Sequence, residues 1–255
     1  MRILIKIGSA LISKNHKIDY SWLAVKIQQM AALQKAGNSI VLVTSGAVAA
    51  GMEINGLQER PQEVLRLQML SGQGQVKLIR FYQAQFDIHN VPIGQVLLTH
   101  HNFDKEKELK CIVSIIDAYC RAGVIPVINE NDMVSKDELS DKERIFTDND
   151  ILTALVGKNI GADLTVILTD VDGLYTADPK SGGGEIVKDV KTVTDDIFKM
   201  ATKKTNALGL GGMYSKVQAA AVLNEAGIDT IVANGKYALT DILEGKSPRT
   251  FFHKA

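Results

Sequence analysis

This sequence of 255 residues has few cysteines, few aromatic residues and no net charge, and each of these features argues against a class of protein. The two cysteines, Cys111 and Cys120, form neither a zinc knuckle nor a CxxC redox pair. Aromatic residues make up 5% of the chain, too few to suggest a surface that stacks nucleic-acid bases. Lys and Arg together number 29, as do Asp and Glu, and this zero net charge argues against a polycationic nucleic-acid binder.

Long uncharged hydrophobic runs are also absent. No stretch approaches the ~18–20 apolar residues of a membrane span. Arg2 and Lys6 interrupt the apolar N-terminal run, which also lacks the cleavage site of a secretory signal. We therefore expect a cytoplasmic protein with no membrane and no nucleic-acid partner. With 45% hydrophobic residues, the chain has the composition of a folded protein, and its length fits one large α/β domain, alone or with a small appendage.

Short runs rich in Val and Ile alternate with longer helix-like segments. The runs are typical of strands covered on both faces and span Ile3–Ile7, Ser39–Thr44, Pro92–Leu98, Val124–Ile128, Leu164–Leu168 and Thr230–Ala233. The expected helices span Ser21–Ala36, Gln62–His89 with a break at Gly72 or Gly74, Lys105–Arg121, Asn149–Ile160 and Tyr214–Ala226. This alternation predicts an α/β fold, a three-layer αβα sandwich around a mostly parallel open sheet. Two segments do not follow the alternation of strands and helices. We expect a hairpin or lid over Met133–Phe146, and an irregular excursion with short strands over Leu174–Thr194.

Small, polar or acidic residues follow four of the expected strands. They are Gly8 and Ser9, then Ser45, Gly46 and Ala47, then Asn129, Glu130, Asn131 and Asp132, and finally Thr169 and Asp170. Ligands of open α/β sheets bind beyond the carboxyl ends of the strands, and small residues there let backbone N–H groups approach an anion. The alternative is that each group only forms a strand-to-helix turn. The recurrence at several strand ends favours a ligand site.

Two lysines and an aspartate stand at notable places. Lys6 lies inside an apolar strand, where a cation is costly unless it meets an anion; the alternative is an edge strand with Lys6 facing solvent. Lys216 stands near the start of an expected helix, where it either adds to the positive field of that helix end or is a solvated surface residue. Asp150 lies in the first turn of another helix, a place that favours acidic residues in any case. Neither lysine belongs to a Walker A loop, and no GxGxxG follows a strand.

Beyond these patterns, the sequence resembles the amino acid kinase family over essentially its whole length. The resemblance is carried by the segments IKIGSALIS, IVLVTSGAVAAGM, VPIGQVLLT, VIPVINENDMV, TDNDILTALV, ILTDVDGLYTADPK, LGLGGMYSKVQAA and AGIDTIVANG. The combination of TSGA, NEND and DND is its narrowest part and is similar to members that phosphorylate glutamate. The resemblance implies a single amino acid kinase domain over residues 1–255, without the C-terminal PUA domain that many bacterial members carry.

The resemblance also implies roles for individual residues. It assigns contacts with the transferring phosphoryl group to Lys6 and Lys216, oriented by Asp150, with backbone N–H groups offered by Gly8 and Gly46. The positions that match the family's glutamate-binding residues are Ser45, Asp132 and Asn149, with Asn129 and Asn131 close by. The positions that match its ATP-binding residues are Lys6, Thr169, Asp170, Asp178, Pro179, Leu210, Gly211, Gly212, Met213, Tyr214, Ser215 and Lys216. Leu210 stands where many members have Thr, and Tyr214 and Ser215 replace two small hydroxyl residues, so we expect one hydroxyl contact fewer with the triphosphate.

The reaction implied by the resemblance is ATP-dependent phosphorylation of the side-chain carboxylate of L-glutamate, the first step of proline biosynthesis. That carboxylate is ionised at pH 7, because its reference pKa is about 4.3, and it needs no general base. The difficulty is repulsion between two anions, which fixed positive charge and N–H donors relieve. Mg²⁺ is the implied cofactor, and we expect ATP phosphates and water to hold it without a direct protein ligand. His100 and His101 are adjacent in the chain and are not expected to bind one metal.

The resemblance further implies a homodimer or homotetramer, and inhibition by proline, which shares the α-amino acid head group. Two other interpretations stay open. One is another acyl-phosphate kinase of the family, such as an aspartokinase or a kinase of acetylglutamate, a substrate with no ammonium group for Asp132. The other is a non-catalytic sensor of amino acids or nucleotides that kept the fold.

Overall fold

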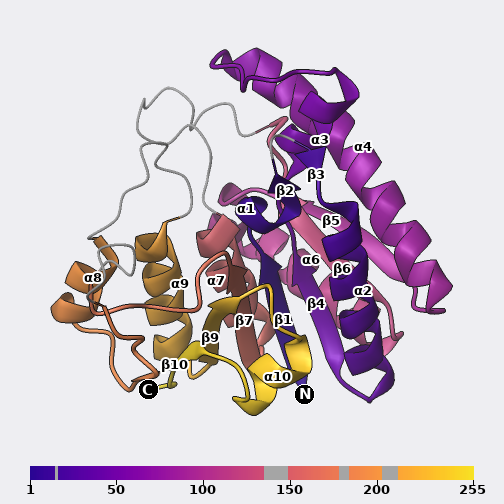
Figure 1. The fold of residues 1–255 in the computed structure, drawn as a ribbon. Coiled ribbons are helices and arrows are strands. Elements are labelled where there is room, and N and C mark those ends of the chain that lie inside the picture. Colours follow the sequence, from indigo (N-terminus) through magenta and orange to yellow (C-terminus); the bar gives the residue numbers. More distant parts are fainter. Residues whose placement is uncertain (15–16, 135–148, 178–183, 203–211) are drawn as a thin grey trace. The chain divides into compact units, whose positions relative to one another are not determined.

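The computed structural model describes residues 1–14, 17–134, 149–177, 184–202 and 212–255, drawn in colour in Figure 1. The chain divides into two compact units. The first unit joins Met1–Ile7 to Asp148–Ala255, and the second unit is Gly8–Thr147. Within the described ranges, no helix combines the length and the apolar character that crossing a membrane requires.

The sheet of the first unit brings three buried parallel strands side by side. In hydrogen-bonded order its strands are β1 (Arg2–Ile7), β7 (Leu164–Thr169), β9 (Asp229–Asn234), β10 (Arg249–Phe252) and β8 (Asp189–Val190). Ile5, Val166 and Ile231 are paired across the three parallel strands β1, β7 and β9. The near-continuous Val and Ile runs of these strands are buried, as parallel strands covered on both faces require. β10 runs antiparallel to β9.

Helices α7 and α9 of the first unit pack against its strands and against each other. The described helices of this unit are α7 (Asn149–Ile160), α8 (Asp195–Thr202), α9 (Met213–Glu225) and α10 (Leu239–Glu244). α7 packs against α9 and β1, while α9 packs against α8 and β9. Leu152, Val217 and Leu223 form part of this buried packing. The residues in the first turns of α7 and α9 are thereby held in one unit with β1.

In its described residues, the second unit has three parallel strands and a small antiparallel pair, called here the hairpin. In order, the parallel strands are β5 (Ile93–Leu98), β6 (Ile125–Glu130) and β4 (Ser39–Val43), and the hairpin pairs β2 (Ser13–Lys14) with β3 (Lys17–Ile18). The described helices are α1 (Ser9–Ile12), α2 (Tyr20–Lys35), α3 (Ala47–Ile54), α4 (Val64–Ile88), α5 (His101–Asp104) and α6 (Glu106–Arg121). Figure 1 shows α2 in front of the strands of this unit and α6 behind them. Asp19 caps α2 by accepting a hydrogen bond from the backbone N–H of Trp22 at 3.0 Å.

The expected break in the long helix at Gly72 or Gly74 is wrong, because α4 runs unbroken from Val64 to Ile88. Gly74 instead allows helix α4 to pack closely against helix α3. A Cβ atom at Gly74 would lie 1.7 Å from the carbonyl oxygen of Ala47, the first residue of α3. The missing side chain lets the backbones of α3 and α4 meet, and the helix pays only the modest propensity cost of glycine.

The expected strands and long helices are all present, with bounds within two residues of those predicted. The excursion after β7 is confirmed in its described part, where an antiparallel bridge joins Tyr175 to Ile186 and β8 follows. Most of the expected hairpin or lid lies outside the described residues, since they resume only at Asn149. The shorter elements that the sequence analysis did not predict are α1, β2, β3, α3, α5, α8, α10 and β10.

Candidate active site

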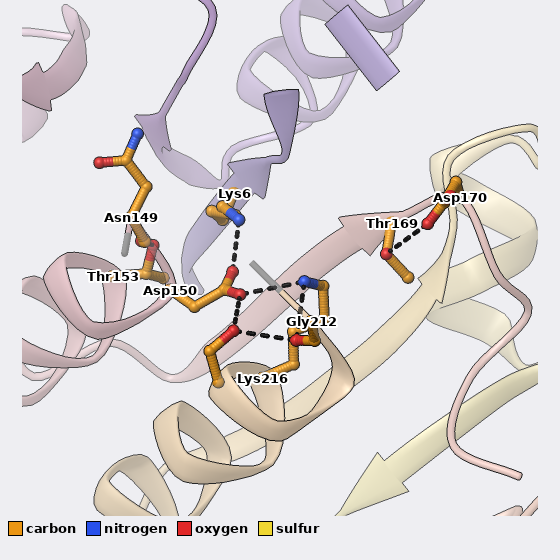
Figure 2. Close-up of polar contacts among 9 residues, drawn as sticks. Lys6, Asn149, Asp150, Thr153, Thr169, Asp170, Gly212 and Lys216 are labelled. Atoms are coloured by element: carbon orange, nitrogen blue, oxygen red, sulfur yellow. Dashed lines mark hydrogen bonds and ion pairs between the residues drawn. The ribbon is translucent and has the colours of Figure 1, made fainter. Parts of the chain in front are cut away.

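Three charged side chains of the first unit meet in its interior (Figure 2). Lys6 comes from β1, Asp150 from the first turn of α7, and Lys216 from the first turn of α9. The Lys6 ammonium binds Oδ1 of Asp150, and the Lys216 ammonium binds Oδ2 at 3.0 Å. Lys6 is 3% exposed, Asp150 0% and Lys216 4%. The alternatives of a solvent-facing Lys6 and a solvated Lys216 are therefore wrong.

The electrostatic balance of this cluster favours an anion. Burial acts to raise the pKa of Asp150, but the charges of Lys6 and Lys216 outweigh it and hold the pKa well below its ordinary value. Asp150 therefore stays a carboxylate at neutral pH, and the three side chains carry a net charge of plus one. An anion bound beside the two ammonium groups would be attracted by both of them, and more strongly at a buried place than in water.

Ser215 belongs to the same cluster. Its Oγ lies 2.8 Å from Oδ2 of Asp150 and 2.9 Å from the carbonyl oxygen of Gly212. Lys216 Nζ also lies 3.4 Å from that carbonyl oxygen. The first turn of α9 is thus tied to Asp150 through a hydroxyl as well as an ammonium group. The role of Ser215 in binding ATP stays a prediction.

Other residues expected to bind ATP lie at the end of β7 and the start of α9. Thr169 is buried and its hydroxyl donates to Oδ1 of Asp170 at 3.2 Å (Figure 2). Tyr214 is 46% exposed, and the centroid of its ring lies 5.4 Å from the centroid of the Phe198 ring. Met213 begins α9. Asp178, Pro179, Leu210 and Gly211 lie outside the described residues.

In the second unit, the structure holds Asp132 against helix α4. The hydroxyl of Ser71 donates to Oδ2 of Asp132, and the side-chain amide of Gln68 donates to the Asp132 carbonyl oxygen at 3.1 Å. Burial raises the pKa of Asp132, while the hydrogen bond from Ser71 and the charge of Arg60 offset part of that rise. A carboxylate in such surroundings gains more from an ammonium partner than one in water does.

The other expected substrate residues of this unit lie near the ends of β6 and β4. Asn129 is 4% exposed and donates from Nδ2 to Oε1 of Gln75 at 3.2 Å. Gln75 in turn donates from Nε2 to the carbonyl oxygen of Glu130 at 3.1 Å. The backbone N–H of Asn131 donates to the carbonyl oxygen of Leu98 at 2.7 Å. Ser45 follows β4 and is 7% exposed.

The two glycines expected to offer N–H groups both precede helices. Gly8 is the N-cap residue of α1, and Gly46 is the N-cap residue of α3. Gly46 has a φ of 93°, in the left-handed region, and an added Cβ would lie 2.9 Å from Cγ2 of Ile12. Glycine is therefore favoured at this position both by the left-handed backbone and by the lack of space for a side chain. Because glycine has no side chain, the start of α3 has no side-chain cap.

The structure brings together Lys6, Asp150 and Lys216 in the first unit, and Asp132 and Asn129 against α4 in the second. Asn149 lies beside Asp150 at the start of α7, and its carbonyl oxygen accepts a hydrogen bond from Thr153 at 2.6 Å (Figure 2). The sequence analysis missed the residues that hold Asn129 and Asp132, which are Gln68, Ser71 and Gln75. Polar residues spaced three and four apart along one helix are the available signal for them.

Comparisons with known proteins agree with this architecture. The sequence profile of the amino acid kinase family matches residues 1–234. The chain is 37% identical over 254 residues to a protein of Aliivibrio fischeri named glutamate 5-kinase, and 38% identical over 255 residues to proteins of that name from Salmonella paratyphi B and Escherichia coli O1:K1. Each of these comparisons covers 98% of this chain and 68% of the relative.

Two solved structures share the fold. Carbamate kinase from Giardia lamblia bound to AMP-PNP superposes with a TM-score of 0.68 at 16% identity, covering 100% of this chain and 98% of that one. UMP kinase from Ureaplasma parvum superposes with a TM-score of 0.64 at 14% identity, covering 99% and 98%. Identities this low show the fold alone. They confirm the predicted α/β class with a mostly parallel sheet and covering helices.

Proposed function

Because the chain belongs to the amino acid kinase family, we propose that it transfers the γ-phosphoryl group of ATP to the side-chain carboxylate of L-glutamate, forming L-glutamyl 5-phosphate. This is the reaction of a glutamate 5-kinase and the first step of proline biosynthesis. The observation that carries the proposal is the buried cluster of Lys6, Asp150 and Lys216, with its net charge of plus one. The relatives named glutamate 5-kinase, 37–38% identical over 98% of the chain, support the choice of glutamate.

The proposed chemistry needs positive charge more than it needs a base. The acceptor carboxylate of glutamate is ionised at neutral pH, with a reference pKa of about 4.3, so no group has to remove a proton from it. In the transition state, negative charge spreads over the oxygens of the transferring group. Ammonium groups that are already fixed and desolvated stabilise that charge without reorganising. Lys6 and Lys216 supply them, and Asp150 holds both in place.

The nucleotide is proposed to lie along the first unit. Thr169 and Asp170 at the end of β7, and the residues from Gly212 to Lys216 at the start of α9, are the described positions that would contact it. Asp178, Pro179, Leu210 and Gly211 complete this proposed set. Backbone N–H groups of Gly8 and Gly46 are proposed as further donors to the phosphates.

Mg²⁺ fits this site as a companion of ATP. Both carboxylate oxygens of Asp150 already bind lysine ammonium groups. ATP phosphates and water are proposed to hold the ion, a donor set that Mg²⁺ accepts readily. When bound, Mg²⁺ neutralises phosphate charge. The protein residues position the reactants around it.

Recognition of the amino acid is proposed to centre on Asp132, which would bind the α-ammonium group of glutamate. Asn129, Asn131, Ser45 and Asn149 are the proposed accompanying contacts. The distance between an ammonium anchor and the phosphoryl group sets the length of side chain that can react, and aspartate is one methylene shorter.

The remaining proposals concern the whole protein. We propose that residues 1–255 form one amino acid kinase domain, which works in the cytoplasm as a homodimer or homotetramer. Proline is proposed to inhibit the protein, since it carries the same α-amino and α-carboxylate groups as glutamate.

The direct test is product trapping. The protein is incubated with MgATP, hydroxylamine and glutamate, and glutamyl hydroxamate is measured, with aspartate and acetylglutamate in parallel reactions. Formation of hydroxamate from glutamate alone supports the proposal. Reaction with acetylglutamate or aspartate instead would show a different kinase of the family, and no reaction of the folded protein with any of the three would favour a sensor.

A further inference from the structure

Three buried polar side chains lie on one face of helix α4. Gln68, Ser71 and Gln75 are spaced three and four residues apart, so they stand above one another along the helix. They are 7%, 1% and 9% exposed, respectively. Buried polar groups are stable only when they form hydrogen bonds, so the contacts of this face show what the helix holds.

All three side chains bind the end of β6 or the segment that follows it, here called the β6 end segment, Glu130–Asp132. Gln75 donates to the carbonyl oxygen of Glu130 and Gln68 to that of Asp132, each at 3.1 Å. These two amides fix the main chain of the segment. Ser71 differs from them, because its hydroxyl donates to a side-chain oxygen, Oδ2 of Asp132.

The contact of Ser71 fixes the direction of a carboxylate. An ionised carboxylate accepts several hydrogen bonds, and a hydroxyl on Oδ2 leaves Oδ1 and the remaining lone pairs for another donor. A hydrogen bond to an ionised acceptor is also stronger than one between neutral groups. Ser71 therefore restrains the rotation of the Asp132 side chain before any ligand binds.

We propose that Ser71 is a positioning residue, which orients the Asp132 carboxylate to receive the α-ammonium group of the amino-acid substrate. The inference rests on the proposed function. Ser71 does not touch the substrate or the reacting atoms. Its effect is confined to the affinity for substrates that carry an α-ammonium group, and it leaves phosphoryl transfer itself unchanged.

The test compares the kinetics of wild-type protein with those of Ser71→Ala in the hydroxamate assay. Loss of one hydrogen bond to a charged group predicts a KM for glutamate about tenfold higher. The KM for ATP and the kcat stay at their wild-type values. Ser114→Ala is the matched control, because Ser114 is exposed on α6 of the same unit, and it leaves all three constants unchanged.

A double-mutant cycle with Asp132→Asn separates positioning from a general structural effect. If Ser71 acts through the Asp132 carboxylate, Ser71→Ala has no further effect on the KM for glutamate once the carboxylate is gone. Glutarate, which lacks the ammonium group, gives a second readout. Its KM stays the same in wild-type protein and Ser71→Ala.

Each outcome decides the inference. An unchanged KM for glutamate in Ser71→Ala, an equal effect in the Asp132→Asn background, or an equal rise in the KM for ATP overturns it while the proposed function stands. Wild-type protein that forms no hydroxamate from glutamate overturns the proposed function, and this inference with it.

Discussion

Lys6 on β1 and Lys216 on α9 bind the two different oxygens of a single carboxylate, that of Asp150. One buried aspartate thereby fixes the positions of two cations from distant parts of the sequence. Two ammonium groups and one carboxylate are thereby held together at a buried place. Preorganised charge of this kind is what phosphoryl transfer to an anionic acceptor requires.

Removing one of these cations should slow catalysis. We expect Lys216→Ala to lower kcat by about 10²–10³-fold, the range found when one donor to a transition state is removed. Lys199→Ala is the control, because Lys199 forms an exposed ion pair with Asp196 in the same unit. Steady-state kinetics of the folded variants gives the comparison, and an unchanged kcat in Lys216→Ala would remove that lysine from the mechanism.

Asp150 should make stability depend on pH in the acid range. Its pKa in the folded protein lies well below the ordinary value of 3.8, so its stabilising contribution is complete above about pH 5 and is lost as the pH falls through the folded pKa. Asp150→Asn removes the carboxylate that both buried ammonium groups bind, and we expect it to lower the free energy of unfolding at pH 7 by about 3–5 kcal/mol.

Urea unfolding of wild-type protein and Asp150→Asn at pH 7 and pH 3 measures this effect. The gap between the two proteins should narrow at pH 3, because this pH lies below the ordinary pKa of 3.8 and the wild-type protein has lost part of the contribution from Asp150 there. Asp196→Asn, at an exposed ion pair, should change stability by no more than about 0.5 kcal/mol. A gap that is constant from pH 7 to pH 3 would contradict the assignment.

Asp132 should control the affinity for glutamate and its dependence on pH. We expect Asp132→Ala to raise the KM for glutamate and to leave the KM for ATP unchanged. Burial raises the pKa of Asp132, so the carboxylate becomes protonated, and loses its attraction for an ammonium group, at a higher pH than an exposed aspartate would. In wild-type protein, kcat/KM for glutamate should therefore fall as the pH is lowered toward that pKa. A rise in the KM for ATP alone would show that Asp132 serves the nucleotide.

Two glycines of α4 should respond differently to alanine. Gly74→Ala places a Cβ atom 1.7 Å from a backbone oxygen of α3, and we expect a loss of about 1–3 kcal/mol of stability. At Gly72 the same atom would meet Sδ of Met133 at 2.9 Å, the end of a flexible side chain that can move aside. Thermal unfolding should therefore show a large drop in Tm for Gly74→Ala and a small change for Gly72→Ala. Equal changes would contradict the close packing of α3 and α4.

The strands and long helices were predictable because each combines a clear hydrophobic pattern with an end signal. Helix α3 was not, because its sequence AVAAGMEI is apolar on most sides and begins after a left-handed glycine, Gly46, without a capping side chain. Strand β10 has four residues, and only its pairing with β8 and β9 identifies it. Gly74 was misinterpreted as a helix break, because its reason is contact with a helix distant in sequence.

In the candidate site, too, some residues could be predicted from the sequence and others could not. Lys6 and Lys216 could be singled out as cations in costly places, and the family resemblance supplied their link to Asp150. Ser71 could not be singled out, because a serine in a helix gains meaning only when the fold places it against Asp132. A residue that only orients another side chain, as Ser71 is proposed to do, belongs to no sequence motif that would identify it.

A crystal structure with MgADP, a planar fluoride analogue of the transferring phosphoryl group, and glutamate would test the two lysines most directly. We expect Nζ of Lys6 and Nζ of Lys216 each within about 3 Å of a fluoride atom of the analogue, with the glutamate carboxylate in line. Ammonium groups that point away from the analogue, with both reactants bound and the protein folded, would contradict the proposed mechanism.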